Sequence, residues 1–297
     1  MKYKITHTTL YTYGEAVPVC HNLLHLTPRE GHGQTCRHHK LIIRPHPTSI
    51  GRRSDTFGNL VHFFSVEQAH KRLRVTSISR TEISGPQIPD PAATPPWESV
   101  RDHLHQKVEP AWLEAVQFAF DSPAVVTFEA LADYARTSFP AGRPILEAAL
   151  DLTRRIHDDF KFDPTATEVG SSLSEIFVLR RGVCQDFAHL QIGCLRSLGL
   201  AARYVSGYLR TRPPPGKPRL VGVDASHAWV SVFCGNAGWV DADPTNNVIP
   251  SVDHVTIAWG RDYHDVSPIK GVVIGGSQHT LRVAVDVMPL EDDPPAS

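Results

Sequence analysis

The residue best suited to chemistry in this sequence is a cysteine at the start of a predicted helix. Apolar residues at helical spacing between Phe187 and Leu198 share one face, so the helix is expected to begin near Cys184. Unpaired N–H groups and the positive end of the dipole at a helix start favour a thiolate, which is the nucleophilic form of cysteine. Gly182 has no side chain and would leave room for a substrate. Cys184 is therefore the candidate nucleophile.

A histidine and an aspartate follow this cysteine along the chain. His227 opens one predicted strand, and Asp243 ends the next, where Pro244 stops it. Adjacent antiparallel strands place such positions side by side. A thiol, an imidazole within hydrogen-bond reach and a group that orients the imidazole are what nucleophilic catalysis needs. Asp241 points to the same strand face as Asp243, so geometry alone leaves both carboxylates as candidates.

Neighbouring residues would shape such a site. The backbone N–H of Cys184 is a natural oxyanion donor because it lies at a helix start, and Gln185 is a chemically suitable second donor. Trp229 shares a strand face with His227 and is interpreted as a wall of the site. Asp186 would oppose a thiolate only if its carboxylate pointed at the thiol.

The sequence pattern predicts an α+β protein with two parts, a β-sandwich and a catalytic core, which together must position these residues. Residues 1–84 alternate polar and apolar types, as from Tyr3 to Tyr13, which predicts an antiparallel β-sandwich. Residues 85–97 are rich in proline and are interpreted as a linker. Residues 98–297 are predicted to form the catalytic core, with helices packed on an antiparallel sheet, a helical lead-in and C-terminal strands.

Local signals place the elements of this core. Helical spacing covers 128–135 and 145–160, and Ser172 with Glu175 is typical of a capping box. Strands are predicted at 202–209, 227–233, 238–243 and 281–287.

Composition excludes several classes of partner. The 297 residues carry 30 Lys plus Arg and 31 Asp plus Glu, so no strong field exists to attract nucleic acid or an anionic membrane. No stretch approaches the roughly 20 apolar residues that span a bilayer. The amino terminus, from Met1 to His7, is typical of a first strand and not of a signal peptide. We therefore expect a cytoplasmic protein; its oligomeric state is open.

Five cysteines are too few for a disulfide framework, and because their number is odd at least one free thiol is expected. Cys194 and Cys234 are interpreted as core residues. Two amino-terminal runs could bring metal ligands together, but neither has the paired-cysteine hooks of a structural zinc site. We therefore predict no metal and no cofactor, and we interpret the histidines of these runs as surface residues. The first run contains Cys20, His21 and His25, and the second contains Cys36, His38 and His39.

Four ordered blocks resemble the transglutaminase-like superfamily: residues 181–189, 202–208, 226–230 and 238–245. Tyr11 to Tyr13, Leu24 to Arg29, residues 260–266 and the final strand are similar to bacterial members with an N-terminal β region. The resemblance implies a papain-like core with a Cys184–His227–Asp243 triad. It selects Asp243 over Asp241, because Pro244 and Thr245 match the family block.

The same resemblance implies acyl transfer through a thioester. Cys184 would attack a carboxamide carbonyl, His227 would carry the proton, and Asp243 would orient His227. The expected substrate is a protein, a peptide or a small amide, and hydrolysis, as a protease or amidase, is the favoured outcome. Two alternatives remain: a transglutaminase that passes the acyl group to an amine, and a non-catalytic interaction protein in which the amino-terminal sandwich binds a partner.

Overall fold

Alternating burial along the first strand explains how the amino-terminal sheets form. In β1 (Lys2–Val17), Tyr3, Ile5 and His7 are buried, while Lys4 between them is exposed. A strand with this period must cover one face with a second layer. The computed structural model describes residues 1–31, 33–168, 170–211 and 225–290, and within them the second layer is another sheet.

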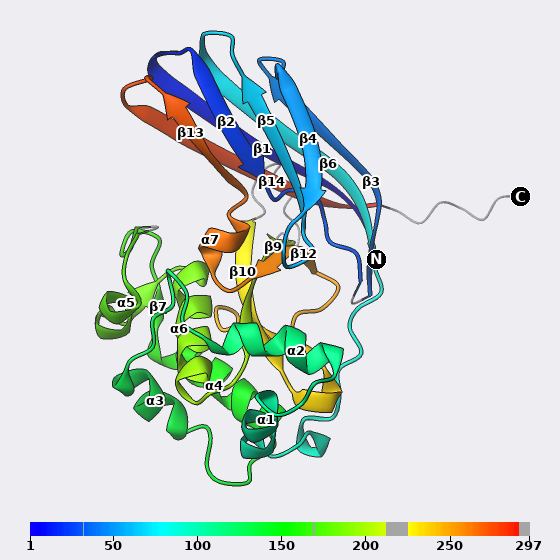
Figure 1. Cartoon of the computed structure of the whole chain (residues 1–297), viewed down its shortest axis with the longest axis vertical. Coiled ribbons are helices and arrows are strands. Elements are labelled where there is room, and N and C mark those ends of the chain that lie inside the picture. The colour runs from blue at the N-terminus through cyan, green and yellow to red at the C-terminus, as the bar shows by residue number, and fades with distance from the viewer. Residues whose placement is uncertain (32, 169, 212–224, 291–297) are drawn as a thin grey trace, which may run out of the picture.

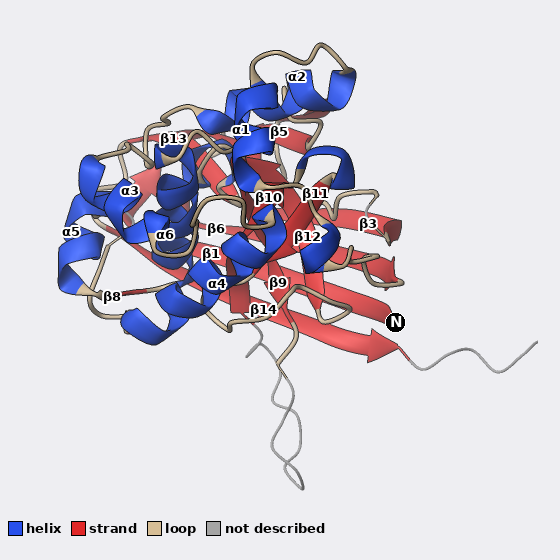
Figure 2. Ribbon diagram, turned by 90° about the horizontal axis from the view of Figure 1, so that it is seen from below, coloured by secondary structure: helices blue, strands red, loops and turns tan. Residues whose placement is uncertain are grey.

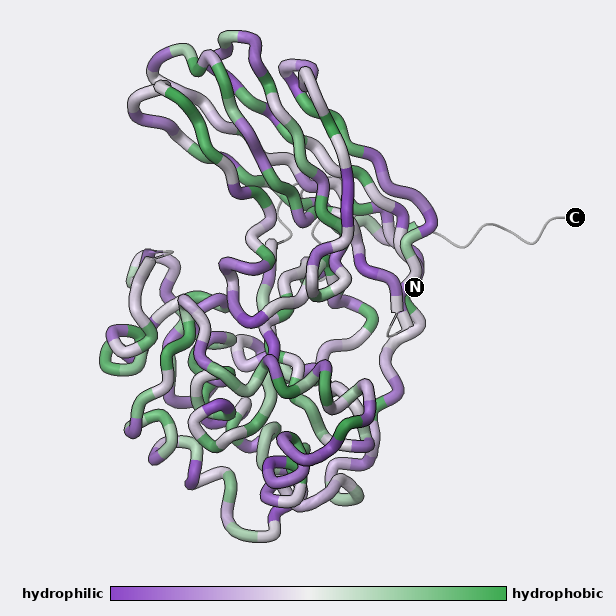
Figure 3. The backbone as a smooth tube through the Cα atoms, in the orientation of Figure 1, coloured by the Kyte–Doolittle hydropathy of each residue, from purple (hydrophilic) through white to green (hydrophobic). Residues whose placement is uncertain are grey.

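The two sheets form a β-sandwich, in which hydrophobic and hydrophilic residues alternate along the strands (Figure 3). One sheet has the order β14-β1-β6-β3 and the other β13-β2-β5-β4. Both sheets contribute to the apolar core between them, for example through Val17, Phe64 and Val75. The remaining strands are β2 (Val19–Leu24), β3 (Gln34–Arg44), β4 (Ser49–Ser54), β5 (Leu60–Val66), β6 (His70–Ile83), β13 (Ile269–Ile274) and β14 (His279–Leu290).

The last two strands differ from the division made on the sequence, which placed them with the catalytic core. β14 pairs antiparallel with β1, from Lys2 opposite Leu290 to Tyr13 opposite His279. β13 pairs with β2 in the same way. The alternation of apolar residues in the last strand predicted a strand but carried no information about its neighbour. The carboxyl-terminal part of the chain therefore returns to complete the sandwich (Figure 1).

The core has a four-stranded antiparallel sheet with the order β11-β10-β9-β12. Its strands are β9 (Ala202–Leu209), β10 (Ala225–Phe233), β11 (Trp239–Ala242) and β12 (His254–Gly260). Helices gather on the side of this sheet away from the sandwich (Figures 1 and 2). They are α1 (Trp97–Leu104), α2 (Pro110–Val116), α3 (Glu129–Arg136), α4 (Ile145–Asp159), α5 (Leu173–Leu179) and α6 (Cys184–Ser197), with α7 (Tyr263–Val266) beside β12.

The fold therefore belongs to the α+β class that the sequence predicted. The capping box at the start of α5 is present: Ser172 and Glu175 each accept from the other's backbone N–H. None of the helices in the described residues is long and apolar enough to cross a membrane.

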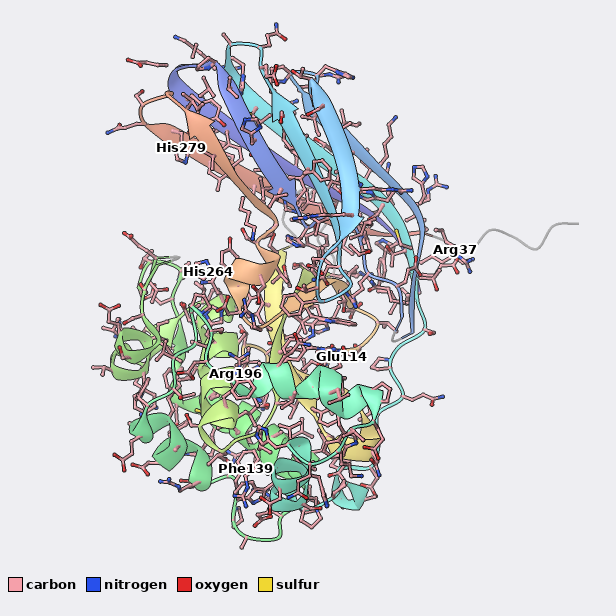
Figure 4. All side chains as sticks on the ribbon, in the orientation of Figure 1. Arg37, Glu114, Phe139, Arg196, His264 and His279 are labelled. Carbon is pink, nitrogen blue, oxygen red and sulfur yellow. The ribbon has the colours of Figure 1, made fainter. Side chains whose placement is uncertain are left out.

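Buried polar contacts fix the sandwich against the central sheet. Tyr208 Oη of β9 lies 2.9 Å from His7 Nδ1 of β1. Asn59 exchanges two hydrogen bonds with the backbone of Trp259 in β12. On the helical side, the buried Arg196 of α6 (labelled in Figure 4) donates to the carbonyl oxygens of Phe118, Ala202 and Arg261. His227 and Asp243 thus lie on or next to a sheet that is held from both sides, and Cys184 begins a helix packed against it.

Candidate active site

Cys184 is the first residue of α6, where the sequence placed it, and its side chain is partly exposed. A short parallel pair, β7 (Lys161–Phe162) with β8 (Arg181–Gly182), leads the chain into the helix. Asp186 then caps the helix, because its Oδ2 accepts from the Val183 N–H at 2.8 Å and from Thr167 Oγ1 at 2.6 Å. These contacts hold the thiol at the positive end of the helix.

Asp186 also explains the glycine before the cysteine. A Cβ at Gly182 would lie 2.5 Å from Asp186 Oδ2, so a side chain there would displace the cap. The expectation that Gly182 leaves room for a substrate is therefore replaced by a local packing reason. Burial raises the pKa of Asp186, although the bonds from Thr167 and Val183 oppose this. Its carboxylate is engaged by these donors, which weakens its influence on the thiol.

The structure brings the predicted histidine and aspartate together. His227 lies near the start of β10, and Asp243 lies just beyond β11, the antiparallel neighbour of β10. His227 Nε2 is 2.7 Å from Asp243 Oδ2, and both side chains are buried. Because Nε2 is bound to the carboxylate, the other ring nitrogen, Nδ1, is left for the thiol of Cys184, and the nearby thiol contributes to raising the pKa of His227.

Asp243 is a fully buried carboxylate surrounded by donors. Oδ1 accepts from the backbone N–H groups of Thr245 and Asn246, at 2.9 and 3.2 Å. Oδ2 accepts from the Asn246 side-chain amide at 2.7 Å, as well as from His227 and from His254, whose Nε2 is 3.2 Å away. Burial opposes ionisation, but these hydrogen bonds hold the pKa of Asp243 well below its ordinary value. The group is thus a permanent anion beside His227.

This anion sets the charge of His227. Burial alone would lower the pKa of the His227 ring, but the hydrogen bonds to Asp243 and Cys184 outweigh burial and raise the pKa to about 10. A protonated imidazole beside a thiol favours the thiolate. His227 and Asp243 therefore form a buried pair of an imidazolium and a carboxylate.

Asp241, the competing carboxylate, has a different partner. Its Oδ2 accepts from Trp229 Nε1 at 2.8 Å. Trp229 is fully buried, with its ring 6.1 Å from His227 and 5.3 Å from His254. A Cβ at Gly207, opposite His227 in β9, would lie 2.4 Å from this indole. Asp241 therefore positions the tryptophan, which packs against the histidines as a wall would.

The remaining predicted residues fall into two groups. Gln185 is the second residue of α6 and is partly exposed; its role as an oxyanion donor stays a prediction. Cys194 and Cys234 are buried in the core, and burial raises the pKa of each to about 12, so both are poor nucleophiles. His189 accepts from the Tyr263 N–H, which is a structural role.

The amino-terminal cysteines and histidines do not gather into a metal-ligand group of three in the part of the chain that the structure describes. Cys20 and His25 are buried, so the expectation of a surface histidine is wrong for His25, whereas His21 is exposed and bonds to Ser65. In a regular strand Cys36 and His38 would lie on the same face. A bulge between them changes the register, so they do not share a face.

One compact group of ligand types does exist: His227, Asp243 and His254 offer atoms within 4.8 Å of one another. The donors around it favour a hydrogen-bond cluster. The Asn246 amide donates to the same carboxylate oxygen that both histidines contact, and an N–H group there would repel a cation.

Sequence reasoning did not find Asn246 and His254. Asn246 follows Asp243 by three residues and closes a turn whose N–H groups the aspartate accepts, a pattern that Asp-Pro-Thr-Asn could have indicated. His254 begins β12, which pairs with β9 and is not a neighbour of β10 or β11. Only the order of strands brings it to the site.

The charge on His227 gives a pH-dependent expectation. Because its pKa of about 10 exceeds the value of about 6.5 in an unfolded chain, the charged ring stabilises the fold fully below about pH 6.5. That contribution is lost as the pH rises through about 10. We expect NMR of the ring nitrogens to show His227 still protonated at pH 8. His7, whose pKa burial lowers to about 4, should be neutral there and serves as the control. A neutral His227 ring at pH 8 would contradict the ion pair.

Comparison with known families gives two matches along the chain. Residues 3–82 match the bacterial transglutaminase-like N-terminal region. Residues 133–244 match the transglutaminase-like superfamily, a range that contains Cys184, His227 and Asp243.

Similar proteins match either nearly the whole chain or a part of it. An uncharacterised protein of Mycobacterium tuberculosis is 39% identical over 98% of this chain and 94% of its own length. Protein-glutamine gamma-glutamyltransferase of Pseudomonas aeruginosa is 33% identical over 124 residues, which are 41% of this chain and 18% of that protein. Among solved structures, a candidate cysteine protease from Cytophaga hutchinsonii has the same fold, with a TM-score of 0.76, 19% identity, and coverage of 99% of this chain and 93% of that chain.

Proposed function

Because this chain belongs to the transglutaminase-like superfamily and pairs a helix-start cysteine with a charged histidine, we propose that it is a cysteine-dependent acyl-transfer enzyme that hydrolyses peptide or carboxamide bonds. The observation that carries the proposal is the buried Asp243–His227 hydrogen bond of 2.7 Å, together with the partly exposed Cys184 at the start of α6, which contributes to the raised pKa of His227. A structural cysteine needs no such partner.

The first half of the reaction forms a thioester. The Cys184 thiolate attacks the carbonyl carbon, so a C–S bond forms and the carbonyl oxygen becomes an anion. N–H groups in the first turn of α6, beginning with that of Cys184, are donors for this oxyanion. The C–N bond then breaks as the proton on His227 Nδ1 passes to the leaving nitrogen. Asp243 stays ionised and keeps the ring oriented throughout.

The second half regenerates the enzyme. His227, now neutral, takes a proton from water, the oxygen of which bonds to the acyl carbon. The C–S bond breaks and the carboxylic acid leaves, so the thiolate and the imidazolium are restored. An amine in place of water would give an amide, and the same residues would have catalysed a transfer.

Amine transfer is the second candidate function, and it is favoured by the 33% identity over 124 residues to a protein-glutamine gamma-glutamyltransferase. The two outcomes separate in one experiment with an unfolded protein as substrate and a fluorescent primary alkylamine in excess. Both outcomes release the first leaving group, so hydrolysis is measured as the new amino termini and ammonia formed in excess of the amine incorporated. We expect this excess to be larger than the covalent incorporation of the amine. Incorporation that equals or exceeds hydrolysis would instead assign a transferase, and Cys184→Ala supplies the blank for both signals.

A further inference from the structure

His254 contacts Asp243 but has no part in the reaction steps above, and we propose that it is a positioning residue that aims the Asp243 carboxylate at His227. The proposal rests on the function proposed above. His254 is buried at the start of β12, and its Nε2 lies 3.2 Å from the same Asp243 oxygen that His227 contacts. The carboxylate is thus shared by two imidazoles.

The second ring nitrogen fixes where the His254 proton lies. The Ser251 N–H approaches His254 Nδ1 at 3.4 Å. A backbone N–H can only donate, so Nδ1 is the acceptor and Nε2 carries the hydrogen. Nε2 therefore donates to Asp243. The ring is also held by the edge-on indole of Trp229, with 84° between the planes.

The hydrogen bond from His254 helps to fix the rotation of the Asp243 carboxylate about its last side-chain bond. Rotation of an aspartate about its last bond is broad, so the direction of Oδ2 depends on its partners. Two backbone N–H groups anchor Oδ1, which leaves Oδ2 to His254, Asn246 and His227. Removal of His254 takes away one of the three contacts on Oδ2, which lets the carboxylate shift relative to His227 and the imidazole tilt from Cys184.

The charged groups around His254 can affect any pH-dependent measurement on this residue. Its ring lines a cavity of about 70 Å³ between the sandwich and the core. The titratable and charged groups that face it are His227 and Asp243 in the site and Arg29, Glu30, Arg203 and Asp241 on the cavity wall. The test below changes none of these groups.

Two substitutions of different length test the contact. In His254→Gln the amide nitrogen stands near the position of Nε2 and can still donate to Asp243. In His254→Asn the shorter side chain can still accept from Ser251 but does not reach Asp243. We expect His254→Asn to lower kcat at least tenfold with KM within about twofold, and His254→Gln to stay within about threefold of the wild type, because small misplacements of catalytic groups cost up to about 100-fold.

The rate at which iodoacetamide alkylates Cys184 provides a readout that stability alone would not move. In the wild type, the imidazolium keeps alkylation fast at pH 6 relative to pH 9. We expect this ratio to fall in His254→Asn and to be retained in His254→Gln. His7→Asn is the matched control, because His7 is also a buried histidine and its hydrogen bonds go to Tyr208 and Thr9. It should leave the ratio unchanged in the folded protein.

The outcomes are distinguishable. Equal loss of kcat in both His254 variants, or no loss in His254→Asn, overturns the positioning role while leaving the enzyme assignment intact. A wild-type protein without amide hydrolysis, amine transfer or selective alkylation of Cys184 defeats the proposed function itself.

Discussion

Replacement of Cys184 by alanine is expected to remove amide hydrolysis and amine transfer, with a loss of roughly 10⁶-fold in kcat as for other nucleophile deletions. Cys194 and Cys234 cannot substitute, since they are buried, with pKa values raised to about 12. Folding should be little affected, because Cys184 is partly exposed. Steady-state kinetics and the far-ultraviolet circular dichroism of the two proteins check both statements.

Iodoacetamide labelling supplies the control for this experiment. In the native wild type at near-neutral pH, mass spectrometry should find Cys184 labelled before Cys194. Cys36 is also partly exposed, but burial raises its pKa, so it should react more slowly. Activity that survives in Cys184→Ala would disprove the assignment. A wild type that neither cleaves amides nor labels selectively would instead support the non-catalytic interaction protein.

Asp243→Ala should have the second largest effect, and it should affect both activity and stability. Loss of the orienting carboxylate in a triad lowers kcat by about 10⁴-fold. The substitution also leaves His227, His254, Asn246 and two backbone N–H groups without their buried acceptor. Breaking a buried ionic contact of this kind costs about 3–5 kcal/mol. Urea denaturation and kinetics below the unfolding transition measure the two effects.

Asp241→Ala is the matched variant, two residues away. Its carboxylate is partly exposed and bonds to Trp229, so we expect a loss of only about 1 kcal/mol and a much smaller change in kcat. The reverse ranking, with Asp241→Ala the more damaging to kcat, would assign the orienting role to Asp241. Similar effects of both variants would mean that neither carboxylate has a specific role.

The parts of the fold that local sequence signals specify were predictable. The start of α6 at Cys184 follows from its apolar face, and the start of α5 follows from the reciprocal bonds of Ser172 and Glu175. The meeting of His227 with Asp243 was also accessible, because β10 and β11 are consecutive and antiparallel. In each case the partners lie near one another in the sequence or on successive strands.

The parts that depend on non-local pairing were not predictable. His254 reaches Asp243 because β9 and β11 end, and β10 and β12 begin, at the same end of the sheet, and no pattern in one strand encodes that order. The reason for Gly182 was misjudged because the capping contact of Asp186 was not visible in the sequence. Alternation in the last strand likewise specified a strand without specifying its partner.

The pairing of β14 with β1 has a consequence for how the protein is made. A ribosome releases the amino-terminal strands long before it synthesises the strands that complete their sheets. Until then β1 and β2 are edge strands with unpaired backbone groups, and such edges are templates for pairing with other chains. The strands β1 to β6 are therefore synthesised before the catalytic core, and their sheets are completed after it. The nascent chain has to keep its amino-terminal strands from intermolecular pairing while the catalytic core forms.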